Sequence, residues 1–151
     1  MLIRLTPQYC PDAATAVVLD TNVVLDWLLF RSPEGLAVGL QVTTGRWRWI
    51  ATATMRDELN HVLQRGNFVR WQVDPVAIDA AWAEHCQEVI APSQAVRFLC
   101  SDPDDQKFID LAVAAAPRLL TQDRAVLKLA RRLRKVGVEV LTPSAWLAST
   151  N

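Results

Sequence analysis

Short apolar segments alternate with helical patterns along this chain, and this alternation restricts its fold more than any other feature. Residues Ala16–Leu19 are all apolar and contain two adjacent valines, which is typical of a strand buried on both faces. Strands separated by helices pair in parallel and are covered by those helices. The sequence therefore predicts the α/β class, with a mainly parallel sheet between helical layers. Strands are expected at 16–19, 46–50, 95–99, 118–121 and 138–141.

Helices are predicted between these strands where apolar residues recur at intervals of three and four. Pro33 stands at a permitted early position of one helix, and Thr52 or Thr54 can cap another. Gly137 ends the helix that precedes the last strand. The predicted helices cover 23–30, 33–40, 52 or 54 to about 64, 76–90, 105–116, 123–136 and 143–148.

Length and composition fit one globular domain. The chain has 151 residues, of which 51% are hydrophobic, enough to form a sizeable core. Its 16 acidic and 16 basic side chains cancel, so an anionic partner must be held by a local basic patch. The apolar stretch 17–30 is interrupted by Asp20 and Asp26, and the first residues lack the apolar run of a signal peptide. We therefore expect a cytoplasmic protein with no membrane span. Three scattered cysteines agree with a reducing compartment: Cys10, Cys86 and Cys100.

Acidic residues follow the predicted strands at one edge of the sheet. Asp20 comes directly after the first strand, and Asp123 follows the strand at 118–121. In an open α/β sheet, ligands bind outside the carboxyl ends of the strands, so these two side chains are expected to face a shared site. Four further acids are placed to reach that edge, one in the helix after the second strand and three at a helix start: Glu58, Asp102, Asp104 and Asp105.

Several carboxylates at one place repel each other unless a cation lies among them. Mg²⁺ and Mn²⁺ prefer oxygen ligands, and such an ion can polarise a phosphoryl oxygen and activate water. The acids therefore indicate metal-dependent phosphodiester chemistry. Each acid also has a plainer explanation, because an Asp at a helix start can be a cap and Glu58 can be a solvated helix residue. These explanations would all have to hold at one edge of one sheet, which favours the metal site.

Four motifs occur in a fixed order along the chain: VVLDTNVVLDWLL, TATMRDELNHVL, SDPDDQKFIDLAVAA and RLLTQDRAVL, followed by VEVLTPSAWLAS. Together they resemble a PIN-domain nuclease, in particular the group regarded as toxins of toxin–antitoxin systems, over about residues 16–149. The resemblance implies a single domain built as a three-layer α/β/α sandwich. It also implies Mg²⁺ or Mn²⁺ as cofactor, hydrolysis of RNA, a cognate antitoxin protein as partner, and a homodimer.

The resemblance also implies a role for individual residues. Asp102 and Asp104 are extra acids beside Asp105, so which member of this cluster binds metal stays open at this point. The implied catalytic and metal-binding acids are Asp20, Glu58, Asp105 and Asp123, and the implied supporting residues are Asn22, Thr52, Thr121, Asp102 and Asp104.

Basic residues in the predicted helix 123–136 form a candidate RNA-binding surface. Arg124, Lys128 and Arg131 share one face of a regular helix and would meet RNA phosphates, although a solvated charged face has the same pattern. The alternation of arginine and tryptophan at 46–50 either adds a stacking surface at Trp47 or places the tryptophans in the core, and we prefer the core.

Two other functions fit part of the pattern. A phosphatase of the HAD-like type also begins with an Asp after a buried strand, but it usually has a second Asp two residues later, where this chain has Asn22. A non-catalytic PIN-like domain would keep the same scaffold and bind RNA or a protein without metal.

Overall fold

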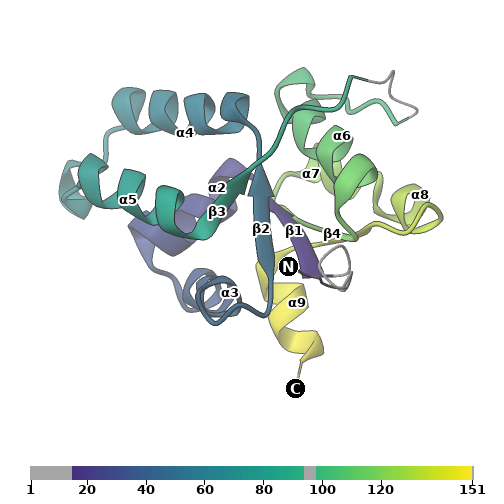
Figure 1. Ribbon diagram of the computed structural model, residues 1–151, viewed down its shortest axis with the longest axis horizontal. Coiled ribbons are helices and arrows are strands. Elements are labelled where there is room, and N and C mark those ends of the chain that lie inside the picture. The colour runs from purple at the N-terminus through teal and green to yellow at the C-terminus, as the bar shows by residue number, and fades with distance from the viewer. Residues whose placement is uncertain (1–14, 94–97, 151) are drawn as a thin grey trace, which may run out of the picture.

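The computed structural model describes residues 15–93 and 98–150, and it contains a five-stranded sheet in the order β3-β2-β1-β4-β5 (Figure 1). Every strand pairs in parallel with its neighbours, so the expected mainly parallel sheet is parallel throughout. The residues that precede the described part, Cys10 among them, and most of the strand expected at 95–99 lie outside it. The strands are β1 (Ala16–Leu19), β2 (Arg48–Ala51), β3 (Cys86–Glu88), β4 (Arg118–Leu120) and β5 (Glu139–Leu141).

Helices cover both faces of the sheet, as the α/β prediction requires. In Figure 1 the helices between β1 and β3 lie on the left of the strands, and those between β3 and β5 lie on the right. The first group comprises α2 (Thr21–Leu25), the π-helix η1 (Asp26–Phe30), α3 (Pro33–Thr43), α4 (Ala53–Arg65), the 3₁₀ turn η2 (Val69–Trp71) and α5 (Pro75–His85). The second comprises the 3₁₀ turn η3 (Pro103–Asp105), α6 (Gln106–Ala115), α7 (Arg124–Leu127) and α8 (Ala130–Arg134), and α9 (Pro143–Ser149) ends the fold.

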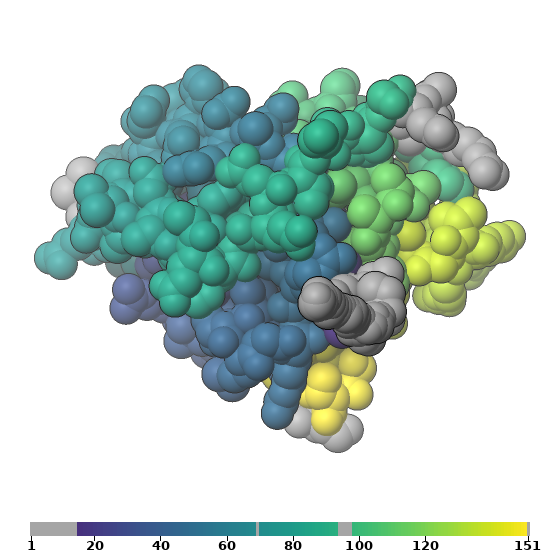
Figure 2. All heavy atoms as spheres, viewed as in Figure 1, coloured from purple at the N-terminus to yellow at the C-terminus, as the bar shows by residue number. Residues whose placement is uncertain are grey.

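The two helical groups also divide the surface of the molecule. In the space-filling view, the blue and teal residues of the first group form the left half, and the green and yellow residues of the second form the right (Figure 2). Helix α9 returns to pack against α3 and β5. None of the helices in the described ranges 15–93 and 98–150 has the length and apolar character needed to cross a bilayer.

Strand β1 lies at the centre of the sheet and is buried on both faces. Each of its four residues is at most 2% exposed, as its uninterrupted apolar sequence predicted. Trp49 on β2 packs edge to face on Trp27 and Trp82, with ring centroids 5.4 and 4.9 Å apart. Trp47 is also buried, against Trp146. The tryptophans of the second strand region therefore belong to the core, and Trp47 provides no stacking surface.

The helix predicted at 76–90 was too long. Helix α5 ends at His85, and Cys86 takes extended angles (φ −99°, ψ 134°) to begin β3, which pairs with β2. The apolar spacing that linked Trp82, Cys86 and Val89 was compatible with either structure. Pairing with the open edge of β2 satisfies backbone groups that would otherwise stay unpaired, and this long-range gain decided the outcome.

The helix predicted at 123–136 is two short helices, α7 and α8, separated at Lys128 and Leu129. The Leu129 N–H bonds to the Val126 carbonyl at 3.0 Å, a three-residue step that tightens the chain. This turn brings Val126, Leu129 and Leu133 into the core together, and each of them is at most 8% exposed. Gly137, with φ 88°, then ends the segment as expected.

Smaller differences concern element ends. The first helix begins at Thr21 rather than 23, and its second half is the π-helix η1. Helix α3 extends to Thr43, and β2 covers Arg48–Ala51 instead of 46–50. Of the residues expected at 95–99, the described Phe98 and Leu99 are not in a strand.

Candidate metal centre

The order of the strands places a topological switch point between β1 and β4. From β1 the chain proceeds to β2 and β3 on one side, and from β4 it proceeds to β5 on the other. Such a switch in direction leaves the carboxyl ends of the two central strands uncovered by a connection, and ligands bind there in α/β proteins. Asp20 follows β1, and Thr121, Gln122 and Asp123 follow β4. The Asp20 N–H bonds to the Leu120 carbonyl at 3.1 Å, which holds the two strand ends together.

Asp20 is a buried carboxylate surrounded by donors of the chain. It is 3% exposed and caps α2, with Oδ1 accepting from the Val23 N–H at 3.0 Å. Oδ2 accepts from the Thr121 hydroxyl and from the Gln122 N–H at 3.4 Å. Burial raises the pKa of Asp20 to about 6, the hydrogen bonds oppose this rise, and the charge of Asp123 adds to it.

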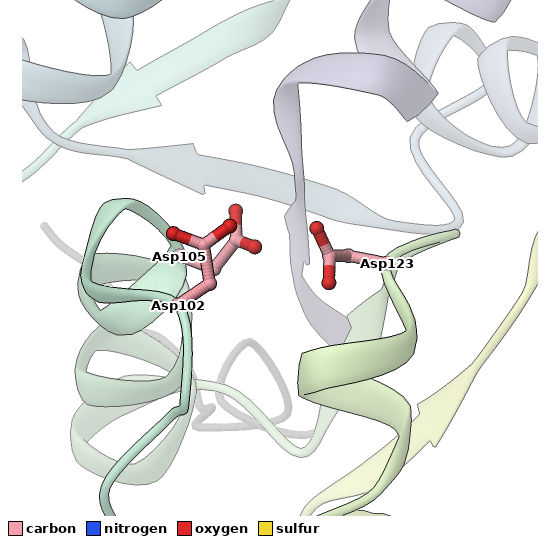
Figure 3. A group of neighbouring side chains, drawn as sticks. All are labelled: Asp102, Asp105 and Asp123. Carbon is pink, nitrogen blue, oxygen red and sulfur yellow. The ribbon is translucent and has the colours of Figure 1, made fainter.

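Three further aspartates meet beside Asp20. Asp102, Asp105 and Asp123, here called the three-aspartate group, place one carboxylate oxygen each within 4.8 Å of one another. Figure 3 shows Asp102 and Asp105 at the start of α6 facing Asp123 at the start of α7. Asp102 caps η3 by accepting from the Asp104 N–H at 3.0 Å, and Asp123 caps α7 by accepting from the Ala125 N–H at 2.8 Å. The cap explanation for Asp123 therefore holds, and it also fixes this carboxylate toward the other two.

Asp105 is the least satisfied member of the group. Its Oδ2 is buried and meets no hydrogen-bond donor among the described residues. Burial, a hydrogen bond with Asp123 and the charges of Asp123, Asp102 and Asp20 together raise the pKa of Asp105 to about 8. A carboxylate that is desolvated and repelled by three neighbours is costly unless a cation binds it. The all-oxygen donor set therefore fits a hard divalent ion such as Mg²⁺ or Mn²⁺.

Asp104, the third acid of the 102–105 cluster, is exposed and lies outside the three-aspartate group. Its backbone instead contacts residues of the site: the N–H donates to the Asp102 carboxylate, and the carbonyl accepts from the Lys107 ammonium. The structure thus brings Asp102 and Asp105, but not Asp104, to Asp123.

Glu58 on α4 is not part of the three-aspartate group either. Its two oxygens accept from Thr21 and Lys107, through the hydroxyl and the ammonium respectively. Thr21 is the neighbour of Asp20 and Lys107 lies two residues after Asp105, so Glu58 is attached to the site through these two side chains.

The supporting residues take different positions. Thr121 is fully buried, donates to Asp20 and accepts from the Asp123 N–H at 3.0 Å, so it links two of the acids. Thr52 is buried as the cap of α4, the helix that carries Glu58, and accepts from the Met55 N–H at 3.4 Å. Asn22 is exposed, and its side chain has no hydrogen-bond partner in the described part of the chain.

Three residues at the site were missed in the sequence. Gln122, to which no role was given, binds Asp20 through its N–H and Asp26 through its side-chain amide. Burial raises the pKa of Asp26, and the Gln122 amide opposes this. Lys107 and Thr21 are 49 and 37 residues from Glu58, so no local pattern could have indicated these pairs.

A family model of the PIN domain matches residues 16–125, which include every acid described above. The chain belongs to the PIN-domain family. PIN domains are typically nucleases that use divalent metal ions, in agreement with the three-aspartate group. No curated protein matches the chain. The all-parallel sheet between helical layers confirms the fold that the PIN resemblance implied.

Proposed function

We propose that this PIN domain is an endoribonuclease that depends on Mg²⁺ or Mn²⁺. The observation that carries this proposal is the three-aspartate group, with its buried and unpaired Asp105 Oδ2, at the switch point of the sheet. A metal-dependent nuclease uses a cation to polarise the phosphodiester, and these oxygens are the ligands that such a cation prefers. The family match favours this function over the HAD-like phosphatase.

Asp105, Asp123, Asp102 and Asp20 would hold the metal, with Glu58 at the rim. A bound divalent ion would polarise a phosphoryl oxygen and lower the pKa of a bound water. The chain itself fixes the carboxylates, since Thr121 orients Asp20 and the helix starts orient Asp102 and Asp123. Because Asp20 and Asp105 have raised pKa values, the site gains full negative charge only toward alkaline pH when no metal is bound.

RNA would be guided to the site by basic residues next to Asp123. Arg124, Lys128 and Arg131 are all exposed and lie within eight residues of it, on α7, its C-cap and α8. The break between α7 and α8 means that these residues do not form the regular stripe expected for one helix. Their charge still supports phosphate contacts beside an otherwise acidic site, in a chain with no net charge.

The biological role that we propose is that of the toxin in a type II toxin–antitoxin pair, active as a homodimer and inhibited by an antitoxin. The support is the resemblance of the ordered motifs to that group of PIN domains. Growth arrest on expression of the chain, relieved by the product of a small adjacent gene, would agree with this role. Growth that is unaffected by expression would contradict it.

RNA cleavage by the purified chain tests the enzymatic proposal. We expect cleavage with Mn²⁺ or Mg²⁺, none with chelator, and a loss of about 100-fold or more in Asp105→Asn, since even partners of metal ligands contribute roughly 10–100-fold. The matched control is Asp79→Asn, an exposed acid on α5 that pairs with Arg56 at 3.7 Å and should keep full activity.

Cleavage that persists in chelator and in Asp105→Asn would overturn the proposal. RNA binding without cleavage under any metal condition would instead identify the non-catalytic alternative.

A further inference from the structure

Glu58 and the three-aspartate group differ in how their charge is balanced. Among the described residues, none of the salt bridges reaches Asp102, Asp105 or Asp123. Glu58, by contrast, forms a salt bridge with Lys107, and the two side chains are only 25% and 22% exposed. A pair this sheltered is less screened by solvent and salt than a surface pair. The chain therefore supplies a cation to Glu58 and none to the three-aspartate group.

Lys107 is fixed by three contacts. Its ammonium donates to Glu58 Oε1 and to the Asp104 carbonyl, and it lies over the Phe108 ring at 4.9 Å from the centroid. Phe108 is itself 1% exposed, so this ring provides a rigid support. The ammonium is thus held between α4 and the start of α6, beside the loop that carries two of the aspartates.

The second oxygen of Glu58 is also engaged, because Oε2 accepts from the Thr21 hydroxyl. Both oxygens consequently have a donor from the chain. Each oxygen still keeps a lone pair, so what opposes a metal ion at Glu58 is the positive charge of the adjacent Lys107 ammonium. In sites with two metal ions the ions lie roughly 3.5–4 Å apart and share surrounding carboxylates. At this rim the chain already places one cation, the Lys107 ammonium, on Glu58.

We propose that Lys107 is the resident counter-ion of Glu58 and limits the site to one divalent ion, bound by the three-aspartate group together with Asp20. The inference rests on the proposed metal-dependent function and assigns Lys107 as a positioning residue that acts through Glu58. The pairing explains why Glu58, unlike the other implied ligands Asp105 and Asp123, lies outside the three-aspartate group. In this arrangement the divalent ion is the cation of the aspartates, and the Lys107 ammonium is the cation of Glu58.

Mn²⁺ titration of the purified full chain without RNA, followed by the electron paramagnetic resonance signal of free Mn²⁺, tests this proposal. We expect about one Mn²⁺ per chain in the wild type and about two in Lys107→Met, where Glu58 is released. Lys107→Arg retains the positive charge and should still bind about one Mn²⁺ per chain. The matched control is Lys135→Met, an exposed lysine after α8, which should also stay near one.

The double variant Lys107→Met/Glu58→Gln should return to about one Mn²⁺, since the released carboxylate is then absent. If circular dichroism shows that Lys107→Met is unfolded, Glu58→Gln alone decides, because it should leave the wild-type stoichiometry unchanged. Three results would overturn the inference and leave the ribonuclease proposal standing. They are two bound ions in the wild type, one bound ion in a folded Lys107→Met, and a loss of Mn²⁺ binding in Glu58→Gln. Absence of Mn²⁺ binding in every variant would overturn both.

Discussion

At the scale of single residues, Asp20 shows how a buried charge is retained. A carboxylate that is 3% exposed would ordinarily be excluded from a core, and burial accordingly raises its pKa to about 6. Donors from Val23, Thr121 and Gln122 compensate part of this cost. Two of these donors come from the loop after β4, so the neighbouring strand helps to keep Asp20 in place.

Thr121→Val tests that dependence. The substitution keeps the shape of the side chain but leaves Asp20 Oδ2 without the hydroxyl donor. We expect the free energy of unfolding at pH 7 to fall by about 3 kcal/mol, because a buried charged acceptor loses its partner. Urea denaturation measures this change. Thr121→Ser keeps the hydroxyl and should lose only about 1 kcal/mol for the missing methyl group, so an equal loss in both variants would contradict the argument.

At the scale of elements, α3 approaches the start of the π-helix η1 closely. Gly35 lies in the first turn of α3, and a Cβ there would be 2.3 Å from the Asp26 carbonyl oxygen. A Cβ on Gly39, one turn later, would be 2.1 Å from the Trp27 indole nitrogen. The two glycines therefore allow the helix backbone to contact the π-helix directly.

Gly35→Ala should destabilise the protein, although glycine to alanine in a helix usually gains about 1 kcal/mol. The clash is with backbone, which cannot turn away as a side chain can, so we expect a loss of about 1–3 kcal/mol in the free energy of unfolding. Thermal and urea denaturation would measure it. The control Thr43→Ala changes an exposed residue at the end of the same helix and should alter stability by less than about 0.5 kcal/mol. A more stable Gly35→Ala would show that the two elements can separate without cost.

Two incorrect element predictions have a common cause. Both the extended helix at 76–90 and the single helix at 123–136 were inferred from local apolar spacing. Cys86–Glu88 became a strand because β2 offered a free edge, and the basic helix broke at Leu129 because the core required that side chain. Local spacing does not contain either requirement, since both come from residues distant in sequence.

At the scale of the whole molecule, the acids of the site couple stability to pH. The pKa of Asp20 is raised to about 6 and that of Asp105 to about 8, both from an ordinary value of 3.8. The folded state therefore holds protons that the unfolded state has released, and stability must fall as pH rises from about 4 to about 8. A metal ion that binds the ionised carboxylates reverses this loss.

Melting temperature measured against pH in chelator tests this coupling. We expect the wild type to lose stability between pH 5 and pH 8, and Asp105→Asn to lose less, so that at pH 8 the variant melts about 3 °C higher. This figure corresponds to about 1 kcal/mol, a value reduced for the partial exposure of Asp105. Adding Mn²⁺ at pH 8 should raise the melting temperature of the wild type more than that of the variant.

Asp79→Asn provides the control, because this exposed acid has no part in the site and should follow the wild-type curve. A wild type whose melting temperature rises steadily from pH 5 to pH 8 in chelator would contradict the raised pKa values of Asp20 and Asp105.

The sequence by itself determined the α/β class, the central strand and the edge of the sheet at which the acids collect. It could do so because burial on both faces demands an uninterrupted apolar strand, and because a parallel sheet directs the residues after its strands to one edge. Only the tertiary structure decided which acids meet. Asp102 and Asp105 reach Asp123, whereas Glu58 is held by Lys107 and Thr21. These pairings join segments many residues apart, and their geometry follows from the packing of helices on the sheet, which local sequence patterns do not specify.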